Sequence, residues 1–178
     1  MLVKTLPLDT KSLDDQGIFR GYASVFNVLD HQGDRVLKGA FQASLSRRMQ
    51  EGNVPKMLWQ HDPKEPIGIW RTLREDNHGL FVEGRLLMNV RRAQEAYALL
   101  KTGVIQGLSI GFTIEDSARL ADGVRYLKSI DLHEISLVTF AANQAAKVLG
   151  VKHAFPVSVQ DNRITADRRN KNNNVSEH

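Results

Sequence analysis

The chain has 178 residues, 42% of them hydrophobic and 25% charged, and its formal net charge of +4 is spread in alternating sign along the sequence. This balance predicts one globular domain and argues against a disordered or fibrous chain and against a basic surface for nucleic acid. The sequence has no cysteine and no apolar run long enough for a membrane span or a signal peptide, which excludes disulfide scaffolds and thiol catalysis and predicts a soluble, intracellular protein without membrane contact.

Strands and one short helix are predicted for the first part of the chain. In order, the predicted elements are a strand at 2–8, a strand at 18–26, a loop at 27–34, a helix at 41–50 and a short strand at 56–60. Tyr22 and Phe26 fall on one parity of an alternating pattern that is typical of a half-buried strand. Phe41, Leu45 and Met49 recur at helical spacing, and this spacing indicates an amphipathic helix.

A hairpin, a longer helix and further strands are predicted for the second part. In order, the predicted elements are strands at 67–74 and 80–87, a helix at 90–102, a strand at 105–114, one or two strands at 124–139 and a short helix at 141–149. Ala93, Tyr97 and Leu100 share one face of the helix at 90–102. Asn89 can cap the start of this helix, and Gly103 can end it.

These elements predict a mostly β fold with helices. About seven strands, largely in hairpin order, favour an antiparallel barrel or sandwich of the α+β class over a doubly wound parallel sheet. The expected domain spans 1–155. From Pro156 onward the sequence is polar, so a disordered tail is expected over 156–178.

Ser109 is a candidate nucleophile because of its neighbours. It lies between Gly107 and Gly111 on the predicted strand, so a substrate chain could approach bare backbone on its face. The alternative is a structural serine beneath a tightly packed neighbouring element. The pattern differs from the nucleophile elbow of the hydrolase fold, which needs a turn from strand to helix, because apolar alternation continues through Phe112 and Ile114.

His61, His133 and Glu134 are candidates for the other catalytic roles. His61 ends a short apolar strand, which is a suitable place for a general base, although a histidine there can also serve only to stabilise the turn. His133 and Glu134 are adjacent on a strand and face opposite ways, so only one of them can orient the base. Glu134 is the stronger candidate because a carboxylate among apolar neighbours is costly without a partner, and its structural alternative is an ion pair with an arginine.

Metal chemistry is a rival hypothesis with weaker support. Asp30 and Asp34 with Gly33 do not match a calcium loop, and we expect them to stabilise a turn. A metallohydrolase would have to use His61, Asp62 and His133. We expect no cofactor and no metal. A binding module or capsid-assembly scaffold without turnover is the non-enzymatic rival.

Taken together, the motifs resemble the prohead protease family of tailed bacteriophages, which shares the serine protease fold of the herpesvirus assemblins. The resemblance runs from about Gly21 to Val151. In order, it includes Gly21-Tyr22-Ala23-Ser24-Val25-Phe26, Asp30 with Gly33-Asp34, Gly39-Ala40-Phe41, Trp59-Gln60-His61-Asp62, Pro66-Ile67-Gly68, His78-Gly79-Leu80, the helix from Ala93 to Gly103, Gly107-Leu108-Ser109-Ile110-Gly111-Phe112 and Glu134-Ile135-Ser136-Leu137-Val138. Singly these motifs are weak, but their order and spacing are specific.

The resemblance implies an assemblin-like barrel in which Ser109 is the nucleophile and His61 its base. It suggests Glu134 as the acidic third member, and His133 is the alternative because herpesvirus relatives use a second histidine. It also implies an endopeptidase inside the immature viral procapsid in the host cytoplasm. Its expected substrates are the scaffolding part of the major capsid protein precursor and the protease itself, and self-association is possible. One departure is Phe140-Ala141-Ala142-Asn143, where relatives tend to carry a proline before Ala-Asn.

The oxyanion donors stay unassigned at this point, although backbone N–H groups must supply some of them. Arg91 and Arg92 begin a helix against the preference of its dipole, so one of them could hold a water or substrate near the site.

Overall fold

The structure is a computed structural model that describes residues 16–150. The strand predicted at 2–8, the polar tail at 156–178 and the expected domain limits therefore lie outside the described residues. The described strands are β1 (Ile18–Val25), β2 (Asp34–Val36), β3 (Lys56–Trp59), β4 (Asp62–Glu75), β5 (Gly79–Leu86), β6 (Gly107–Arg119), β7 (Arg125–Val138) and β8 (Lys147–Gly150). The described helices are α1 (Gln42–Gln50) and α2 (Arg91–Lys101).

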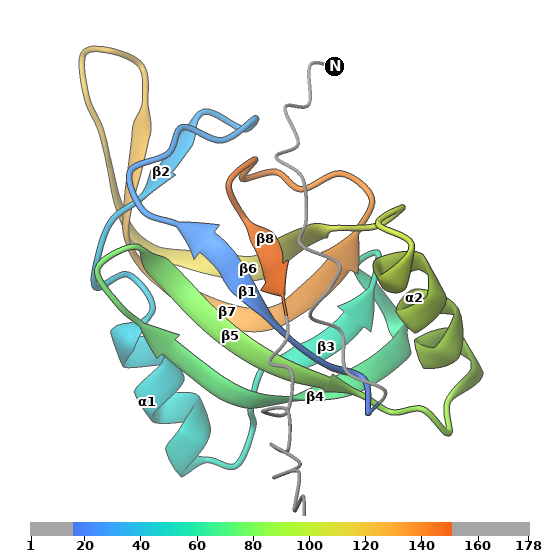
Figure 1. Ribbon diagram of the computed structural model, residues 1–178. Coiled ribbons are helices and arrows are strands. Elements are labelled where there is room, and N and C mark those ends of the chain that lie inside the picture. The colour runs from blue at the N-terminus through green and yellow to red at the C-terminus, as the bar shows by residue number, and fades with distance from the viewer. Residues whose placement is uncertain (1–15, 151–178) are drawn as a thin grey trace, which may run out of the picture.

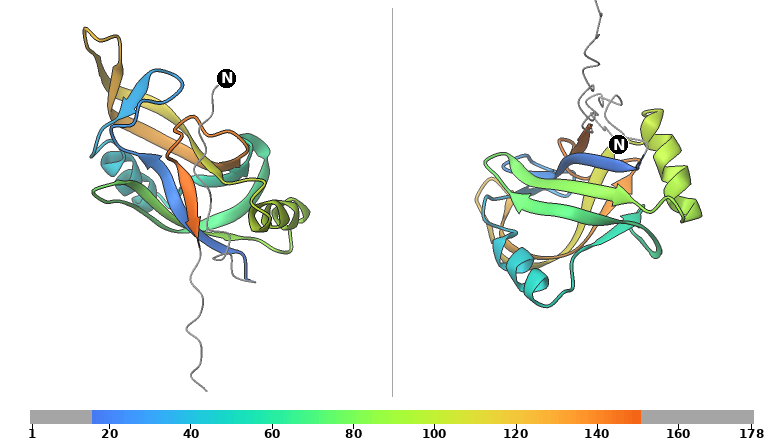
Figure 2. Two further views of the ribbon diagram at one scale, coloured as in Figure 1. Left: turned by 45° about the horizontal axis from the view of Figure 1, so that its top comes forward. Right: turned by 60° about the horizontal axis from the view of Figure 1, so that its bottom comes forward.

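The strands close into a barrel. Their order is β2-β7-β3-β4-β5-β1-β8-β6, and β6 returns to pair with β7, so β2 is attached to β7 outside the closed ring. The two helices lie on different sides of this barrel (Figure 1). The far ends of β6 and β7 project from it as a hairpin (Figures 1 and 2). The expected β-rich barrel with a few helices is confirmed.

The strand directions are mixed. Most pairings are antiparallel, but β2 and β3 both run parallel to β7. The expectation of an antiparallel sheet is therefore corrected for these two pairs. Residue patterns along one strand do not encode the direction of a neighbour that is distant in the sequence, and β3 and β7 are separated by three other strands.

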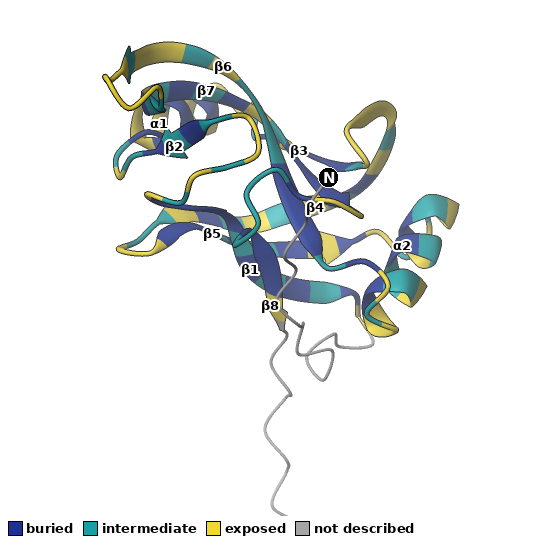
Figure 3. Ribbon diagram, turned by 90° about the horizontal axis from the view of Figure 1, so that it is seen from above, coloured by how far each residue is buried: buried dark blue, intermediate teal, exposed yellow. Residues whose placement is uncertain are grey.

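The apolar side chains fill the interior of the barrel. Phe19, Met57, Ile67, Leu80 and Ile135 are each at most 1% exposed. Figure 3 shows buried residues along the strands, with exposed residues on the loops and on the outer side of α2. The rigid wall built in this way holds the strand ends that carry the site.

Both helices end at a glycine, but α2 does not begin at its expected cap. Gly52 and Gly103 follow α1 and α2 with φ of +67° and +73°, which only glycine adopts without cost. The expected stop at Gly103 is confirmed, and Gly52 ends α1 in the same way. The predicted cap at Asn89 is wrong. Val90 precedes the first helical residue in an extended conformation and provides no side-chain hydrogen bond.

The helix predicted at 141–149 is also wrong. Asn143 donates from Nδ2 to Val25 O at 3.0 Å and accepts the N–H of Ala145 at Oδ1 at 3.1 Å, which holds this segment in turns. The chain then continues as β8 between β1 and β6. The alanine-rich composition favours a helix locally, but closure of the barrel requires a strand here.

Candidate active site

The site is organised around β7, which lies between β3 and β6 in the sheet. Leu58 of β3 and Ser109 of β6 both pair with Ser136 of β7. Gly111 of β6 pairs with Glu134. Three segments that are far apart in the sequence are thus held side by side by backbone hydrogen bonds.

His61 sits in a tight turn between β3 and β4. Gln60 and His61 have φ of +53° and +62°, in the left-handed region that non-glycine residues rarely adopt. The Gln60 side chain stabilises this turn, because its Nε2 donates to Thr139 Oγ1 at 2.8 Å and its Oε1 accepts the Thr139 N–H at 3.2 Å. Such conformations concentrate at functional sites, where the surrounding structure sustains them.

The ring of His61 contacts Glu134. The distance between His61 Nδ1 and Glu134 Oε1 is 2.5 Å. The Glu134 side chain is 13% exposed, whereas that of His61 is 43% exposed. Because the carboxylate accepts the proton of Nδ1, the other ring nitrogen, Nε2, is left as the acceptor of a neutral imidazole.

Ser109 lies in the wall of a pocket of about 370 Å³ that His61 also lines. Asp30, His31 and the segment at 140–143 also line this pocket. Within residues 16–150 no hydrogen bond joins Ser109 to His61 in this state, which is common in proteases without substrate. The pocket places a serine hydroxyl and a histidine ring on one solvent-accessible surface.

The glycines beside Ser109 make room for the protein itself. A Cβ on Gly111 would overlap Oε1 of Glu134, and one on Gly107 would lie 2.8 Å from Val138 O. The expectation that these glycines offer bare backbone to a substrate is therefore corrected, since other parts of the chain fill the space. Gly111 instead leaves room for the carboxylate that contacts His61.

The two faces of β6 are not fully separated at the pocket. Ser109 and its neighbour Ile110 both line the pocket, although successive residues of a strand point to opposite faces. In the described part of the chain, β8 pairs with β6 only at Gly107, so the edge of β6 beyond this point is open to the pocket. The pocket therefore reaches around the edge of the strand.

His133 points away from His61. Its Nδ1 lies 2.6 Å from Arg48 Nη2, and its Nε2 lies 2.8 Å from Thr113 Oγ1. The prediction that only one of the two adjacent residues can reach the base is consistent with this arrangement, and the one that does is Glu134. The partners of Glu134 among residues 16–150 are His61 and Ser136, so the alternative of an arginine ion pair is not realised.

Comparison with known proteins identifies the family. The sequence profile of the caudovirus prohead serine proteases matches residues 6–157. This chain belongs to that family. The prohead protease of Enterobacteria phage HK97 is 37% identical over 159 residues, which cover 85% of this chain and 69% of that protein. The expected family and enzyme class are confirmed.

One further relative and two solved structures are also similar to this chain. The capsid polyprotein of Pseudomonas phage PAJU2 is 31% identical over 151 residues, which cover 75% of this chain and 22% of that protein. The capsid assembly protease of bacteriophage T4 aligns with a TM-score of 0.54 at 10% identity, over 84% of this chain and 90% of that one, and so shares the fold. A protease of the herpesvirus KSHV aligns with a TM-score of 0.48 at 14% identity, over 75% of this chain and 64% of that one.

The residues of the metal hypothesis are not assembled in this prohead protease. His61 and His133 have separate partners, and Asp62 accepts the N–H of Lys64 at 2.8 Å. Within residues 16–150, no group of three potential ligands comes together. Asp30 has the expected turn role, because its Oδ1 accepts the N–H groups of Gln32 at 2.8 Å and Asp34 at 2.9 Å. Burial raises the pKa of its carboxyl.

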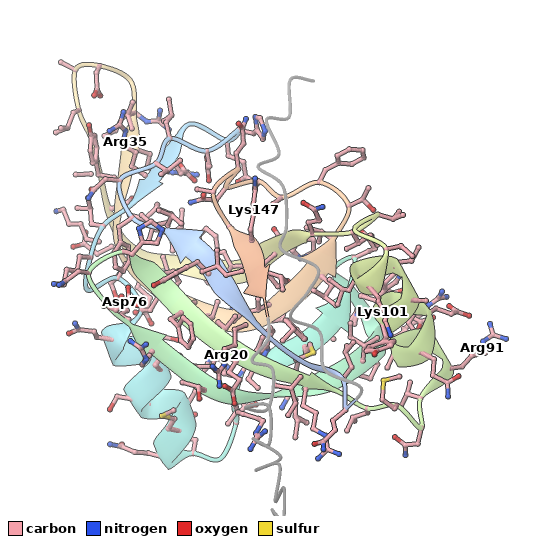
Figure 4. All side chains as sticks on the ribbon, viewed as in Figure 1. Arg20, Arg35, Asp76, Arg91, Lys101 and Lys147 are labelled. Atoms are coloured by element: carbon pink, nitrogen blue, oxygen red, sulfur yellow. The ribbon has the colours of Figure 1, made fainter. Side chains whose placement is uncertain are left out.

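The two arginines at the start of α2 do not reach the pocket. The Arg91 side chain is 86% exposed and points outward from the helix (Figure 4). Arg92 pairs with Glu65 and Glu95, which ties α2 to β4. The hypothesis that either one holds a substrate or water in the pocket is wrong for this conformation.

Ser136 is the residue that sequence reasoning missed. Its hydroxyl donates to Glu134 Oε2 at 2.6 Å and accepts the His61 N–H at 3.1 Å. The available signal was its position two residues after Glu134, on the same face of a strand.

No helix in the described part of the chain is long and apolar enough to cross a membrane.

Proposed function

We propose that Ser109, His61 and Glu134 are the catalytic triad of this prohead serine protease. The observation that carries the proposal is the contact between His61 Nδ1 and Glu134 Oε1, 2.5 Å long, in a pocket that Ser109 also lines. A base with one ring nitrogen held by a carboxylate and the other free is the arrangement that activates a serine.

The reaction is acyl transfer. His61 Nε2 takes the proton of Ser109 Oγ while that oxygen attacks the carbonyl carbon of the scissile peptide bond. The imidazolium that forms is stabilised by the Glu134 carboxylate and gives its proton to the departing amine. A water then attacks the acyl-enzyme. His61 takes the proton of this water and gives it to Ser109 Oγ as the acyl group leaves as a carboxylic acid. Closing the pocket on a substrate has to bring His61 and Ser109 into hydrogen-bond contact.

The substrate that we infer is the precursor of the major capsid protein, cut in its scaffolding part, together with the protease itself. The name of the PAJU2 relative, a capsid polyprotein, supports an association with capsid protein. On this proposal the enzyme acts inside the immature procapsid in the host cytoplasm. Self-association, a disordered tail and the absence of a cofactor stay predictions.

The test is to co-express the chain with the capsid precursor of its own phage, as wild type and as Ser109→Ala, and to measure both proteins by intact mass. We expect the wild type to shorten the precursor and Ser109→Ala to leave it whole, since loss of a triad serine typically costs about 10⁶-fold in rate. Equal cleavage by both forms would refute the assignment of Ser109.

The state of the shell is the necessary control. The same pair should be compared in precursor that has assembled into proheads, because a protease packaged inside a shell can depend on assembly. Intact precursor with the wild type in assembled proheads would favour a scaffold without turnover.

A further inference from the structure

The buried hydroxyl of Ser136 joins two parts of the proposed triad. Ser136 is 0% exposed and lies at the point of β7 where β3 and β6 pair with it on either side. Its cross-strand partner on β6 is Ser109. A polar side chain at such a position is costly to bury unless its hydrogen-bonding capacity is used.

The two hydrogen bonds of this hydroxyl determine its direction. The N–H of His61 donates to Ser136 Oγ at 3.1 Å and so occupies a lone pair of the oxygen. The single hydroxyl proton must then point elsewhere, and Glu134 Oε2 lies 2.6 Å away. This distance is in the short range of hydrogen bonds to a charged acceptor. The backbone N–H of His61 therefore orients the Ser136 hydroxyl, and this hydroxyl in turn holds the Glu134 carboxylate.

The Glu134 carboxylate is held at both oxygens in this way. Oε1 contacts His61 Nδ1 at 2.5 Å, and Oε2 accepts the Ser136 hydroxyl. Without the hydroxyl, Oε2 would lose its partner in a side chain that is only 13% exposed. The carboxylate could then turn about its last side-chain bond, and a displacement of about 1 Å at a catalytic group can cost about 100-fold in rate.

We infer that Ser136 is a positioning residue of this protease, which acts on the reaction by fixing the Glu134 carboxylate against His61. The inference rests on the proposed triad. The rival explanation is that Ser136 is a core residue whose hydroxyl contributes only to folding. The two explanations differ in whether the effect of Ser136 depends on Glu134.

A double-mutant cycle separates them. Ser136→Ala, Glu134→Ala and the double variant are assayed on the capsid precursor with enzyme in excess, followed by intact mass over hours. We expect Ser136→Ala to lower the maximal single-turnover rate constant by about 10- to 100-fold, as loss of an orienting partner does at other sites, with the half-saturating enzyme concentration within about threefold. In the Glu134→Ala background the same change should cost less than about threefold. An equal fold loss in both backgrounds would overturn the inference.

A second pair covers the case in which Ser136→Ala does not fold. Ser136→Thr and Ser136→Val have the same shape and differ in the hydroxyl alone, so Thr should be at least about tenfold more active than Val. Equal activity of the two would also overturn the inference. Ser109→Ala distinguishes a failure of the proposed triad from a failure of the role of Ser136. If it still cleaves, the triad itself is wrong, whereas an inactive Ser109→Ala with independent Ser136 and Glu134 effects refutes the role of Ser136 alone.

Discussion

The side chains of His133 and Glu134, which are neighbours on β7, contact different parts of the molecule. Strand alternation directs Glu134 to His61 at the pocket and His133 to Arg48 on α1. The side chain of His133 is 47% exposed, so its loss should leave little buried surface without a partner. The pair therefore offers a test of the acidic residue with a control one position away.

The first prediction compares Glu134→Ala with His133→Ala. Glu134→Ala should lower kcat by about 10³-fold or more, because the base loses the group that orients it. His133→Ala should keep kcat within about threefold. Cleavage rates of the capsid precursor measure both effects, and thermal unfolding verifies that both variants are folded. The reverse ranking would identify His133 as the third catalytic residue.

Gly111 provides a second prediction at this scale. A Cβ at Gly111 would overlap Glu134 Oε1, the far end of a flexible side chain, so the carboxylate has to turn aside while the backbone stays in place. This movement takes it away from His61. Gly111→Ala should therefore lower kcat by at least about 100-fold while the protein still folds, as its unfolding curve will show. Ser117→Ala, at an exposed position of the same strand, is the control, and full activity of Gly111→Ala would contradict the arrangement.

At the scale of elements, α1 is fastened to β7 by Asp131. The carboxylate accepts hydrogen bonds from Arg48 Nε and Nη2, both at 2.9 Å, from Arg47 Nη2 at 2.8 Å and from Ser44 Oγ at 3.1 Å. The arginine hydrogen bonds, those of Arg48 foremost, hold the pKa of Asp131 well below its ordinary value of 3.8. Ser44 Oγ in turn accepts the N–H of Leu132 at 2.8 Å. The helix is thus attached beside Glu134 without touching the pocket.

The third prediction concerns the pH dependence of this attachment. The folded-state pKa of Asp131 lies below its unfolded value, so its contribution to stability is present above about pH 4 and is lost as pH falls. Asp131→Asn should lower the free energy of unfolding by about 1.5–3 kcal/mol at pH 7, and the difference should shrink below pH 4. Urea unfolding at pH 7 and pH 3 measures it. Asp116→Asn, in an exposed pair, should show no such difference at either pH.

At the scale of the whole molecule, closure of the barrel depends on β8. This strand of four residues lies between β1 and β6, and it approaches β1 closely at Gly21. A Cβ on Gly21 would overlap Lys147 O and would lie 2.7 Å from Val148 Cα, which are backbone atoms that cannot move independently. β8 also follows the segment at 140–143 that lines the pocket, so closure and the shape of the site are linked.

The fourth prediction follows from this close approach. Gly21→Ala should lower the free energy of unfolding by about 3 kcal/mol, because the strands must separate or the backbone must shift. Gly123→Ala is the matched control. It makes the same chemical change in open space at a φ of +79°, where left-handed strain alone should cost about 1 kcal/mol. Equal midpoints in urea would show that β8 does not constrain β1.

Local patterns were sufficient for some elements and insufficient for others. The hairpin of β4 and β5, both helices of the described part and their glycine stops follow from periodicity and from positive φ, which are properties of short segments. The segment at 141–149, which the sequence predicts as a short helix, forms turns and a strand. There the hydrogen bonds of Asn143 and the pairing of β8 with β1 and β6 outweigh a weak intrinsic preference.

The sequence by itself determined the β-rich class, the family and the candidates Ser109, His61 and Glu134, since these rest on alternation, order and spacing along one chain. The tertiary structure decided that β3 runs parallel to β7, that Glu134 and not His133 meets His61, and that Ser136 bridges the two. His61 and Glu134 are 73 residues apart, so their contact depends on the register between strands. A shift of one residue in that register would turn Glu134 to the opposite face of the strand, and the packing of the whole barrel is what excludes this shift.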